Sequence, residues 1–236
     1  MAVTIELLST FSILKSLSEP ALLQLANQSI LRKFSRRGVV LNAGEKEEFL
    51  CFLFEGRLQG VDFTLDGREV GLYFVEPGDF CGELGLFDQR EQPEYVMALT
   101  RSQAVFVPMA ALRSVMFDSR PMMELLCERI AKRVRTMSAQ RSLLGLPNVP
   151  QRVCGQLWML VSDDEKETLG KDAAMAIKNP PTHQEIAIML NLSRESVTRV
   201  FQTLQSRQIV QRDGNARLII SDPGVLKGLA YGDVEL

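Results

Sequence analysis

Apolar residues along the chain change their spacing twice. Up to about residue 33 they recur at helical intervals, which predicts short helices that carry no evident chemistry. From about 36 to 108 the apolar runs are short and separated by turn sequences, which favours a small β-barrel or jelly roll. Five runs carry this pattern: 39–41, 49–54, 70–75, 95–99 and 104–107. From Pro121 to about Leu144 the helical interval returns for much longer.

The stretch 121–144 predicts a single long helix, because Pro121 suits a first turn and the next breaking residue is Gly145. Such a helix can pack its apolar seam into a core or pair it with a second copy of the chain, and the pattern alone leaves both open. Six apolar positions form this seam: Met122, Leu125, Leu126, Ile130, Val134 and Met137.

Gly145 and Pro147 mark a domain boundary, and Asn148 suits the N-cap of the following helix. The segment 163–181 is polar, charged and then Pro-rich, which predicts a solvated surface loop. Residues 209–220 predict a β-hairpin around Asp213-Gly214-Asn215, and 223–236 predict a short terminal helix and tail.

The stretch 182–204 predicts two short helices joined by a tight turn. Thr182 followed by Glu185 is a capping-box pattern at the start of the first helix. Asn191 tolerates the left-handed backbone that the turn needs, and Ser193 is a good N-cap for the second helix. The second helix has an apolar side and a polar side: Val197, Phe201 and Leu204 against Glu195, Thr198, Arg199 and Gln202.

The polar side of this second helix suits the major groove of DNA. An Arg side chain can donate two hydrogen bonds to guanine, and Glu can accept one from cytosine. The alternative is a helical hairpin whose outer face is merely solvated, but caps, turn residue and face chemistry together favour DNA reading. Arg212 and Arg217, on the hairpin that follows, are candidates for phosphate contacts.

The composition does not by itself indicate a nucleic-acid-binding protein, because the net charge is −2 and the isoelectric point is about 5.6. A DNA contact needs only a local basic patch, however. Five arginines gather around the two short helices: Arg194, Arg199, Arg207, Arg212 and Arg217.

Cysteine and histidine usage argues against a metal site or an enzyme. The four cysteines are scattered, with no C-x-x-C pair, so reduced and mostly buried thiols are expected. His183 is the single histidine, which excludes any site built on a histidine pair and removes the usual general base. A cupin-like metal enzyme fused to a DNA-binding domain is therefore a remote alternative, and no cofactor is expected.

The start of the chain lacks the basic segment of a signal peptide. No apolar run is long enough to span a membrane. We therefore expect a cytoplasmic protein without a membrane partner.

Beyond these patterns, the two short helices match a known motif. Thr-x-Gln-Glu-Ile-Ala at 182–187, followed by Ser-Arg-Glu-Ser-Val-x-Arg at 193–199, resembles the helix-turn-helix of the CRP/FNR family of bacterial transcription regulators. The resemblance implies that Arg194, Glu195 and Arg199 read bases in two TGTGA-like half-sites, arranged as an inverted repeat for a homodimer. Ten positions are implied to contact DNA: Thr182, His183, Gln184, Ser193, Arg194, Glu195, Thr198, Arg199, Arg212 and Arg217.

The strand-rich stretch resembles the family's cyclic-nucleotide-binding domain. Asp-Gly-Arg-Glu at 66–69 and Pro-Gly-Asp-Phe-Cys-Gly-Glu-Leu-Gly-Leu-Phe at 77–87 carry the likeness. In this family the second run begins a phosphate-binding cassette, in which a short helix offers amides to the phosphate and Glu takes the ribose hydroxyl. The resemblance implies a ligand pocket made by Gly82, Glu83, Leu84, Gly85, Met137 and Ser138.

This chain departs from the family pattern where cyclic AMP would be held. Binders carry an Arg followed by a small residue, and that Arg neutralises the cyclic phosphate. Here Pro93 or Glu94 occupies the position in a loop one residue shorter, and Met137 replaces a hydroxyl residue that contacts adenine. The effector is therefore expected not to be cyclic AMP, or to be absent, and 82–87 can then serve only the fold. The alternative is a cyclic-nucleotide-responsive regulator in which Arg90 or Arg101 supplies the phosphate contact.

These observations predict an α+β protein. Residues 1–120 form a β-roll or jelly-roll sensor domain, 121–146 a dimerisation helix and hinge, and 147–236 a winged helix-turn-helix domain. The expected partners are double-stranded DNA, a second copy of the chain and RNA polymerase, the last through the loop at 163–181. A small-molecule effector of unknown identity is possible.

Overall fold

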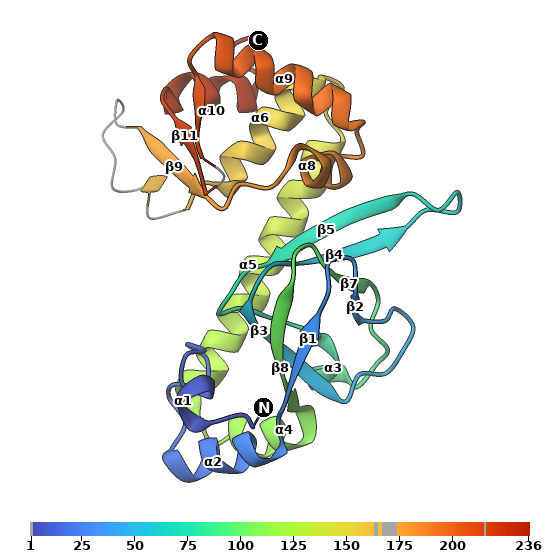
Figure 1. Ribbon diagram of the computed structural model, residues 1–236, viewed down its shortest axis with the longest axis vertical. Helices are drawn as coiled ribbons and strands as arrows, with labels where there is room; N and C mark the ends of the chain where they lie inside the picture. Colours follow the sequence, from blue (N-terminus) through green and yellow to red (C-terminus); the bar gives the residue numbers. More distant parts are fainter. Residues whose placement is uncertain (1, 163–164, 167–173, 215) are drawn as a thin grey trace. The chain divides into compact units, whose positions relative to one another are not determined.

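The computed structural model describes residues 2–162, 165–166, 174–214 and 216–236. The chain forms two compact units, Met1–Thr136 and Met137–Leu236, and the helix α5 (Arg120–Leu144) contributes residues to both (Figure 1). The described residues of each unit enclose apolar cores of their own.

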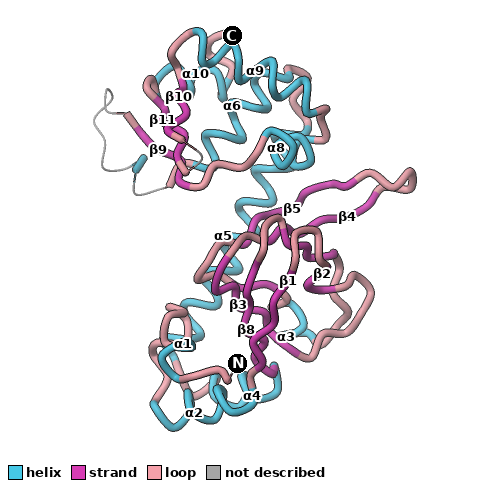
Figure 2. The backbone as a smooth tube through the Cα atoms, viewed as in Figure 1, coloured by secondary structure: helices cyan, strands magenta, loops and turns pink. Residues whose placement is uncertain are grey.

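The first unit is built on two antiparallel four-stranded sheets (Figure 2). One sheet has the strand order β1-β8-β3-β6, and the other has the order β2-β7-β4-β5. The strands are β1 (Ile30–Phe34), β2 (Val39–Leu41), β3 (Phe49–Glu55), β4 (Leu58–Phe63), β5 (Glu69–Val75), β6 (Phe80–Cys81), β7 (Tyr95–Ala98) and β8 (Ser102–Pro108).

Strand β3 shows how the layers of the first unit are arranged. Leu50 and Phe52 join a cluster that includes residues of the helices, whereas Cys51 and Leu53 join the cluster between the two sheets. Because both faces of β3 are buried, its sequence is a continuous apolar run rather than an alternation. The remaining helices of this unit are α1 (Ile5–Leu8), α2 (Glu19–Gln28), α3 (Leu84–Asp88) and α4 (Met109–Met116).

The second unit is a helical domain with a small sheet. Its helices are α6 (Val149–Leu160), α8 (His183–Leu190), α9 (Arg194–Ser206) and α10 (Pro223–Tyr231). Strands β9 (Met175–Lys178), β10 (Val210–Asp213) and β11 (Arg217–Ile220) form a sheet of order β10-β11-β9. The predicted cap of α6 is confirmed, because the Asn148 side chain accepts a hydrogen bond from the Gln151 amide.

The five apolar runs predicted as strands all lie in strands of the first unit, which confirms the expected fold class. Three further strands, β1, β4 and the two-residue β6, were mistaken or missed. The helix expected up to residue 33 is wrong at Ile30–Phe34, which is strand β1 and pairs with β8. Buried and exposed residues do not alternate regularly along β1, because the consecutive residues Arg32 and Lys33 are both exposed. Strand β4 gave no apolar run because Gln59 and Gly60 interrupt it.

The surface loop expected at 163–181 is wrong in part. Met175–Lys178 is a strand that pairs with β11, and Met175 and Ile177 are buried in the core of the second unit. A strand of four residues that ends in Lys178 is too short for its alternation of apolar and polar residues to be recognised within a polar segment. Residues 163–164 and 167–173 of the expected loop lie outside the described residues.

The long helix is confirmed as α5, but its apolar seam divides. Met122 and Leu126 are fully buried in the core of the first unit. Val134 and Met137 are 61% and 44% exposed, and Leu125 is partly exposed as well. The seam is therefore buried core at Met122 and Leu126 and exposed at Val134 and Met137, so pairing with a second copy of the chain stays a prediction.

Within the described part of the chain, no helix is both long and apolar enough to cross a lipid bilayer. Among the same residues, no three His, Cys, Asp or Glu side chains gather as a metal site would require.

Candidate DNA-binding surface and sensor pocket

The turn between α8 and α9 is held by the capping residues expected from the sequence. The Thr182 side chain accepts from the Glu185 amide at 3.2 Å, and the Glu185 carboxylate accepts from the Thr182 amide at 2.8 Å. Asn191 has φ 50° and ψ 50°, the left-handed conformation of the turn. Ser193 caps α9 by accepting from the Ser196 amide at 3.1 Å. These contacts fix where α9 begins.

Helix α9 has one buried side and one exposed side, as predicted. Val197, Phe201 and Leu204 are at most 1% exposed and pack into the core of the second unit. On the other side the arginines, the glutamate and the glutamine of the expected reading face are exposed: Arg194, Glu195, Arg199 and Gln202. Thr198 is only half-exposed, because it lies at the edge of this face against α8.

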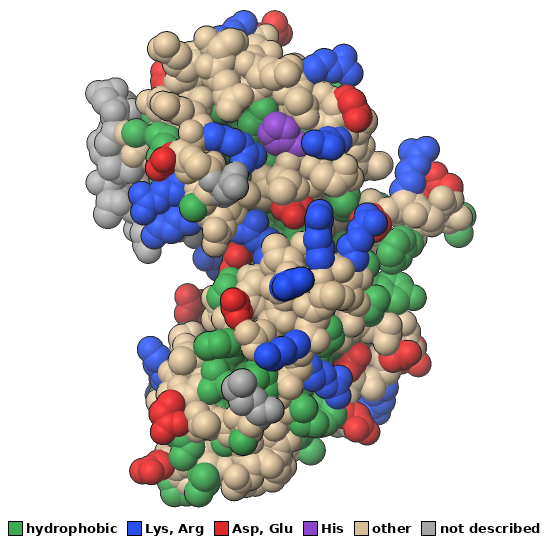
Figure 3. Space-filling model, viewed as in Figure 1, with side chains coloured by type: hydrophobic (Ala, Val, Ile, Leu, Met, Phe, Trp, Pro, Cys, Tyr) green, Lys and Arg blue, Asp and Glu red, His purple; other side chains and the backbone are tan. Residues whose placement is uncertain are grey.

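His183 fills that edge and is partly buried. Its Nδ1 lies 3.0 Å from the Thr198 hydroxyl, and its ring centroid is 4.3 Å from that of Phe201. Burial lowers the pKa of His183, and the positive charges of Arg212 and Arg194 lower it further. Figure 3 shows Lys and Arg side chains on both sides of this single histidine. His183 therefore positions Thr198 and joins a basic surface, instead of standing free in solvent.

The hairpin after α9 is confirmed by its pairing, with Val210 opposite Ile220 and Asp213 opposite Arg217. Arg217 is exposed and Arg212 is half-buried, near His183. Of the turn residues expected from the sequence, Asn215 lies outside the described residues. The hairpin therefore brings Arg212 near His183 of α8, whereas Arg217 shares the opposite face of the hairpin with Asp213.

In the first unit, the expected phosphate-binding cassette has the backbone of such a site. Gly82 has φ +86°, and α3 begins directly after Glu83. Arg113 of α4 anchors α3 by donating to the carbonyls of Gly85 at 2.6 Å and Leu86 at 2.8 Å. A short helix is thus held rigidly beside Glu83.

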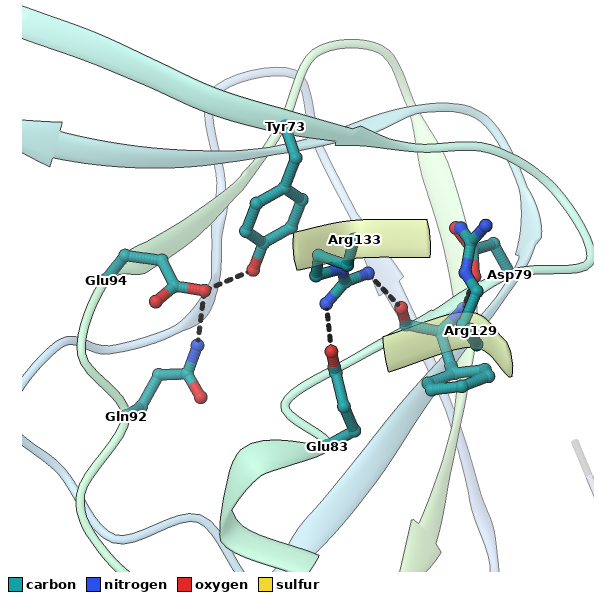
Figure 4. Close-up of polar contacts among 8 residues, drawn as sticks. Tyr73, Asp79, Glu83, Gln92, Glu94, Arg129 and Arg133 are labelled. Carbon is teal, nitrogen blue, oxygen red and sulfur yellow. Dashed lines mark hydrogen bonds and ion pairs between the residues drawn. The ribbon is translucent and has the colours of Figure 1, made fainter. Parts of the chain in front are cut away.

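Glu83 is bonded to a residue of the same unit. Its side chain is 2% exposed and forms an ion pair with Arg133 of α5. The same guanidinium donates to the Phe80 carbonyl at 3.0 Å. One helical turn earlier, Arg129 forms an ion pair with Asp79 (Figure 4). Two arginines of α5 are therefore held by residues on either side of β6.

A second buried network fills the adjoining space. The Tyr73 hydroxyl donates to Glu94, and the Gln92 amide donates to the same carboxylate oxygen at 3.0 Å. The guanidinium carbon of Arg133 lies 4.3 Å from the centroid of the Tyr73 ring. Figure 4 shows Arg133 between Tyr73 and Glu83. The ring also needs the absence of a side chain at Gly60, whose Cβ would lie 2.5 Å from it.

The structure places Glu94 differently from the simple expectation of a carboxylate facing a phosphate. Glu94 is 9% exposed and accepts from Tyr73 and Gln92. Burial raises the pKa of Glu94, although the bond from Tyr73 acts in the opposite sense. Burial and the nearby Glu94 charge raise the pKa of Tyr73, so its hydroxyl stays a donor.

The other residues proposed for this pocket are not brought together with it in the same unit. Met137 and Ser138 are exposed and belong to the second unit, four and five residues after Arg133 on α5. Arg90 and Arg101 are exposed, and the Arg90 backbone amide is bonded to Asp88.

Sequence reasoning missed the residues that fill the pocket: Tyr73, Gln92, Arg129 and Arg133. One signal was available for Arg133, because it precedes Met137 by four residues and so shares its side of a helix.

Comparisons with known proteins agree with this architecture. The model of the cyclic nucleotide-binding domain matches residues 31–119, and that of the Crp-like helix-turn-helix domain matches residues 151–229. The chain belongs to the CRP/FNR family of transcription regulators. It is a DNA-binding regulator with a cyclic-nucleotide-binding-like domain, and its family is not one of enzymes.

Three relatives illustrate the range of this CRP/FNR likeness. The chain is 28% identical over 214 residues to the CRP-like cAMP-activated global transcriptional regulator of Mycobacterium tuberculosis, covering 91% of this chain and 94% of that one. It is 26% identical over 202 residues to the cAMP-activated global transcriptional regulator CRP of Pasteurella multocida, covering 85% and 95%. The solved structure of FixK2 from Bradyrhizobium japonicum superposes with a TM-score of 0.70 at 18% identity, covering 85% and 96%, and shows the fold alone.

Proposed function

We propose that this CRP/FNR regulator binds, as a homodimer, an inverted repeat of TGTGA-like half-sites, and that cyclic AMP does not control it. The observation that carries the proposal is the sensor pocket, in which Glu83 and Glu94 already have partners from the same unit. In this proposal, residues 1–120 form the sensor domain, residues 121–146 form the dimerisation helix and hinge, and residues 147–236 form the DNA-binding domain.

The choice of DNA sequence rests on α9. Arg194, Glu195 and Arg199 are exposed on its outer side, and they match the base-reading positions of the family motif. An exposed Arg can donate two hydrogen bonds to guanine, and Glu can accept from cytosine. Thr182, Gln184, Ser193 and the two hairpin arginines are then candidates for phosphate contacts around the reading helix.

The dimer rests on an apolar stripe of α5 that is exposed at Cys127, Val134 and Met137 and partly buried at Met123 and Ile130. Five of its residues are spaced alternately by four and three positions, as in the seam of a two-stranded coiled coil. These residues are Met123, Cys127, Ile130, Val134 and Met137. This stripe differs from the expected seam, because Met122 and Leu126 are used inside the first unit.

The claim about cyclic AMP rests on charge. A cyclic phosphate needs a positive partner, and the cassette offers Pro93 and the buried carboxylate of Glu94. Arg133 is a cation in the right unit, but it is already bonded to Glu83 and the Phe80 carbonyl. A nucleotide would have to displace Tyr73 and separate these bonds. The relatives from Mycobacterium tuberculosis and Pasteurella multocida are described as cAMP-activated, so this chain would differ from them in its signal.

Two consequences follow for its regulation. Either the free protein already binds DNA, or a ligand other than cyclic AMP acts on the sensor domain. We infer further that it contacts RNA polymerase and acts in the cytoplasm, where a regulator of this family meets its DNA.

The proposal is tested by measuring DNA affinity without any added nucleotide. We expect the full inverted repeat to bind at least about a thousandfold more tightly than a scrambled duplex of equal length. Equal affinity for both duplexes, or specific binding that requires cyclic AMP, would contradict the proposal.

A substitution in the stripe tests the dimer in the same assay. Val134→Asp places a charge on the exposed stripe, where pairing would bury it without a partner. The variant should be monomeric in light scattering and lose about 10²–10⁴-fold in affinity for the full repeat, because it can no longer bind two half-sites at once. Thr136→Asp, exposed on the same helix outside the stripe, is the matched control and should remain dimeric. A dimeric Val134→Asp variant would place the interface elsewhere.

A further inference from the structure

Two buried thiols face each other inside the sensor domain. Cys51 of β3 and Cys81 of β6 are direct partners in the antiparallel pairing of these strands. Both are fully buried and free. A hydrogen bond between the two thiols, together with burial, raises the pKa of the Cys81 thiol well above its usual value. The two side chains therefore face each other, and the charges of Glu83 and Arg133 in the pocket also act on the Cys81 thiol.

The pairing geometry suits a disulfide. Opposed residues of an antiparallel pair have Cα atoms about 4.5–5.5 Å apart. Disulfides span Cα separations of about 4.4–6.8 Å, so the bond can form without separating the strands. Closing two sulfurs from hydrogen-bond contact to about 2.05 Å would nevertheless draw β6 toward β3.

The strand that would move is the one that holds α5. Asp79, directly before β6, pairs with Arg129, and the carbonyl of Phe80 accepts from Arg133. Glu83, two residues after Cys81, pairs with the same Arg133. Every one of these contacts lies within two residues of Cys81, so a bond at its sulfur acts directly on the groups that hold the helix.

Strand β6 can also separate locally from β3. β6 has two residues and lies at the edge of its sheet, where β3 is its sole neighbouring strand among the described residues. Short edge strands open locally at a small cost in free energy compared with global unfolding. Opening would let a molecule as small as hydrogen peroxide reach the thiols.

We propose that Cys51 and Cys81 form a reversible disulfide on exposure to peroxide, and that this bond loosens the hold of β6 on α5. One thiolate attacks peroxide, forming a sulfenic acid and releasing hydroxide. The second thiol then attacks the sulfenic sulfur, and water leaves as the disulfide forms. A reducing dithiol returns the disulfide to two thiols by exchange and is itself oxidised to a disulfide. Because its partner thiol and burial raise the pKa of Cys81 well above its usual value, this thiol is scarcely ionised at neutral pH and its oxidation is slow.

The test uses the full chain carrying Cys127→Ala, which removes the cysteine of the α5 stripe, and the affinity of this variant for the inverted repeat before oxidation is the reference. After peroxide treatment, intact mass should fall by two hydrogen atoms, and peptide mapping should find the peptides of Cys51 and Cys81 joined. Dithiothreitol should restore the original mass. The same chain with Cys81→Ala added should show no such loss. If Cys51 and Cys81 both remain reduced, and no joined peptide forms at peroxide levels that fully oxidise free glutathione, the proposed site is wrong.

The effect on α5 is read in two ways. Hydrogen exchange in the peptide that contains Arg129 and Arg133 should be faster in the oxidised protein. Affinity for the inverted repeat should fall about fivefold or more and recover on reduction. The mass and exchange measurements do not depend on the DNA sequence proposed above. An error in that DNA sequence would therefore be distinguished from an error in the proposed disulfide. A disulfide that changes neither exchange nor affinity would overturn the coupling.

Discussion

On α9, Arg194, Glu195 and Arg199 are exposed on the outer side of the helix, whereas in the sensor pocket Glu83 and Glu94 are 1% and 9% exposed. The two regions both keep the backbone of their family motif. The helix-turn-helix has its caps and its left-handed turn residue, and the cassette has Gly82 and the short helix α3. They differ in what their polar side chains are bonded to.

The comparison teaches that a binding fold can be kept while its binding groups are used internally. On α9 the polar groups remain available to an outside partner, and the buried side alone supplies stability. In the pocket the carboxylates are bonded to Arg133, Tyr73 and Gln92, so they contribute to the fold of the first unit. Substitutions in the pocket should therefore change stability, and substitutions on α9 should change DNA recognition.

The largest expected effect is the loss of stability when Arg133 is removed. Arg133→Ala leaves the buried Glu83 carboxylate without its ion pair, and breaking one side of such a pair typically costs about 3–5 kcal/mol. Urea unfolding followed by circular dichroism should show the loss, whereas the fluorescence of Trp158 should not, because Trp158 belongs to the second unit. The double variant Glu83→Gln/Arg133→Met removes both charges and should recover most of the stability. A single variant as stable as the parent would mean that the ion pair is not a structural contact.

A smaller effect is expected at the reading helix. Arg199→Ala should cost about 1–3 kcal/mol of specific binding and relax the preference at one base pair of each half-site, without changing the unfolding free energy by a comparable amount. Competition binding against a set of single-base variants measures this. Arg207→Ala, exposed at the end of the same helix, is the control. Equal weakening on specific and random DNA would make Arg199 a phosphate contact.

The smallest expected effect concerns His183 and pH. Its pKa is lowered in the free protein by burial and by Arg212 and Arg194, so the unfolded chain binds the proton more readily. Stability above about pH 6.5 is therefore unaffected by His183, and it falls as the pH drops below that value. A DNA phosphate nearby would raise the pKa of His183, so affinity for DNA should rise as the pH falls, by at most about tenfold for each unit of pKa increase.

His183 is the single histidine of the chain, so its proton can be followed directly by NMR with and without DNA. His183→Gln keeps a hydrogen-bonding group beside Thr198 and should remove both pH dependences. A pKa that is the same in free and DNA-bound protein would rule out the proposed linkage.

What the sequence predicted well is local. Caps, turn residue and the two sides of α9 depend on residues at most a few positions apart, and all of them are as expected. Strands β3 and β8, which are buried on both faces over four consecutive residues, were visible as continuous apolar runs. The break at Asn148 was also visible, because a cap is a property of one short segment.

What the sequence did not predict depends on contacts between distant segments. Tyr73 and Glu94 are 21 residues apart and Glu83 and Arg133 are 50 apart, so no periodicity relates them. Departure from the family motif showed that a phosphate contact was missing, but not that Tyr73 and Arg133 would occupy the space. β1 and β9 were mistaken for the same reason, since their strand character comes from pairing with β8 and β11.

The central claim is that Glu83 and Glu94 are bonded within the first unit, and that the positive charge of Arg133 is used by Glu83 and the Phe80 carbonyl and is not offered to a cyclic phosphate. Calorimetric titration of the full-length protein with cyclic AMP, and in parallel with cyclic GMP, tests it most directly. We predict no binding at micromolar concentrations of either nucleotide, because the lost charged contact alone is worth about a hundredfold or more in affinity. Micromolar binding of one nucleotide per chain, abolished in an Arg90→Ala or Arg101→Ala variant, would contradict the account and assign the phosphate contact to that arginine.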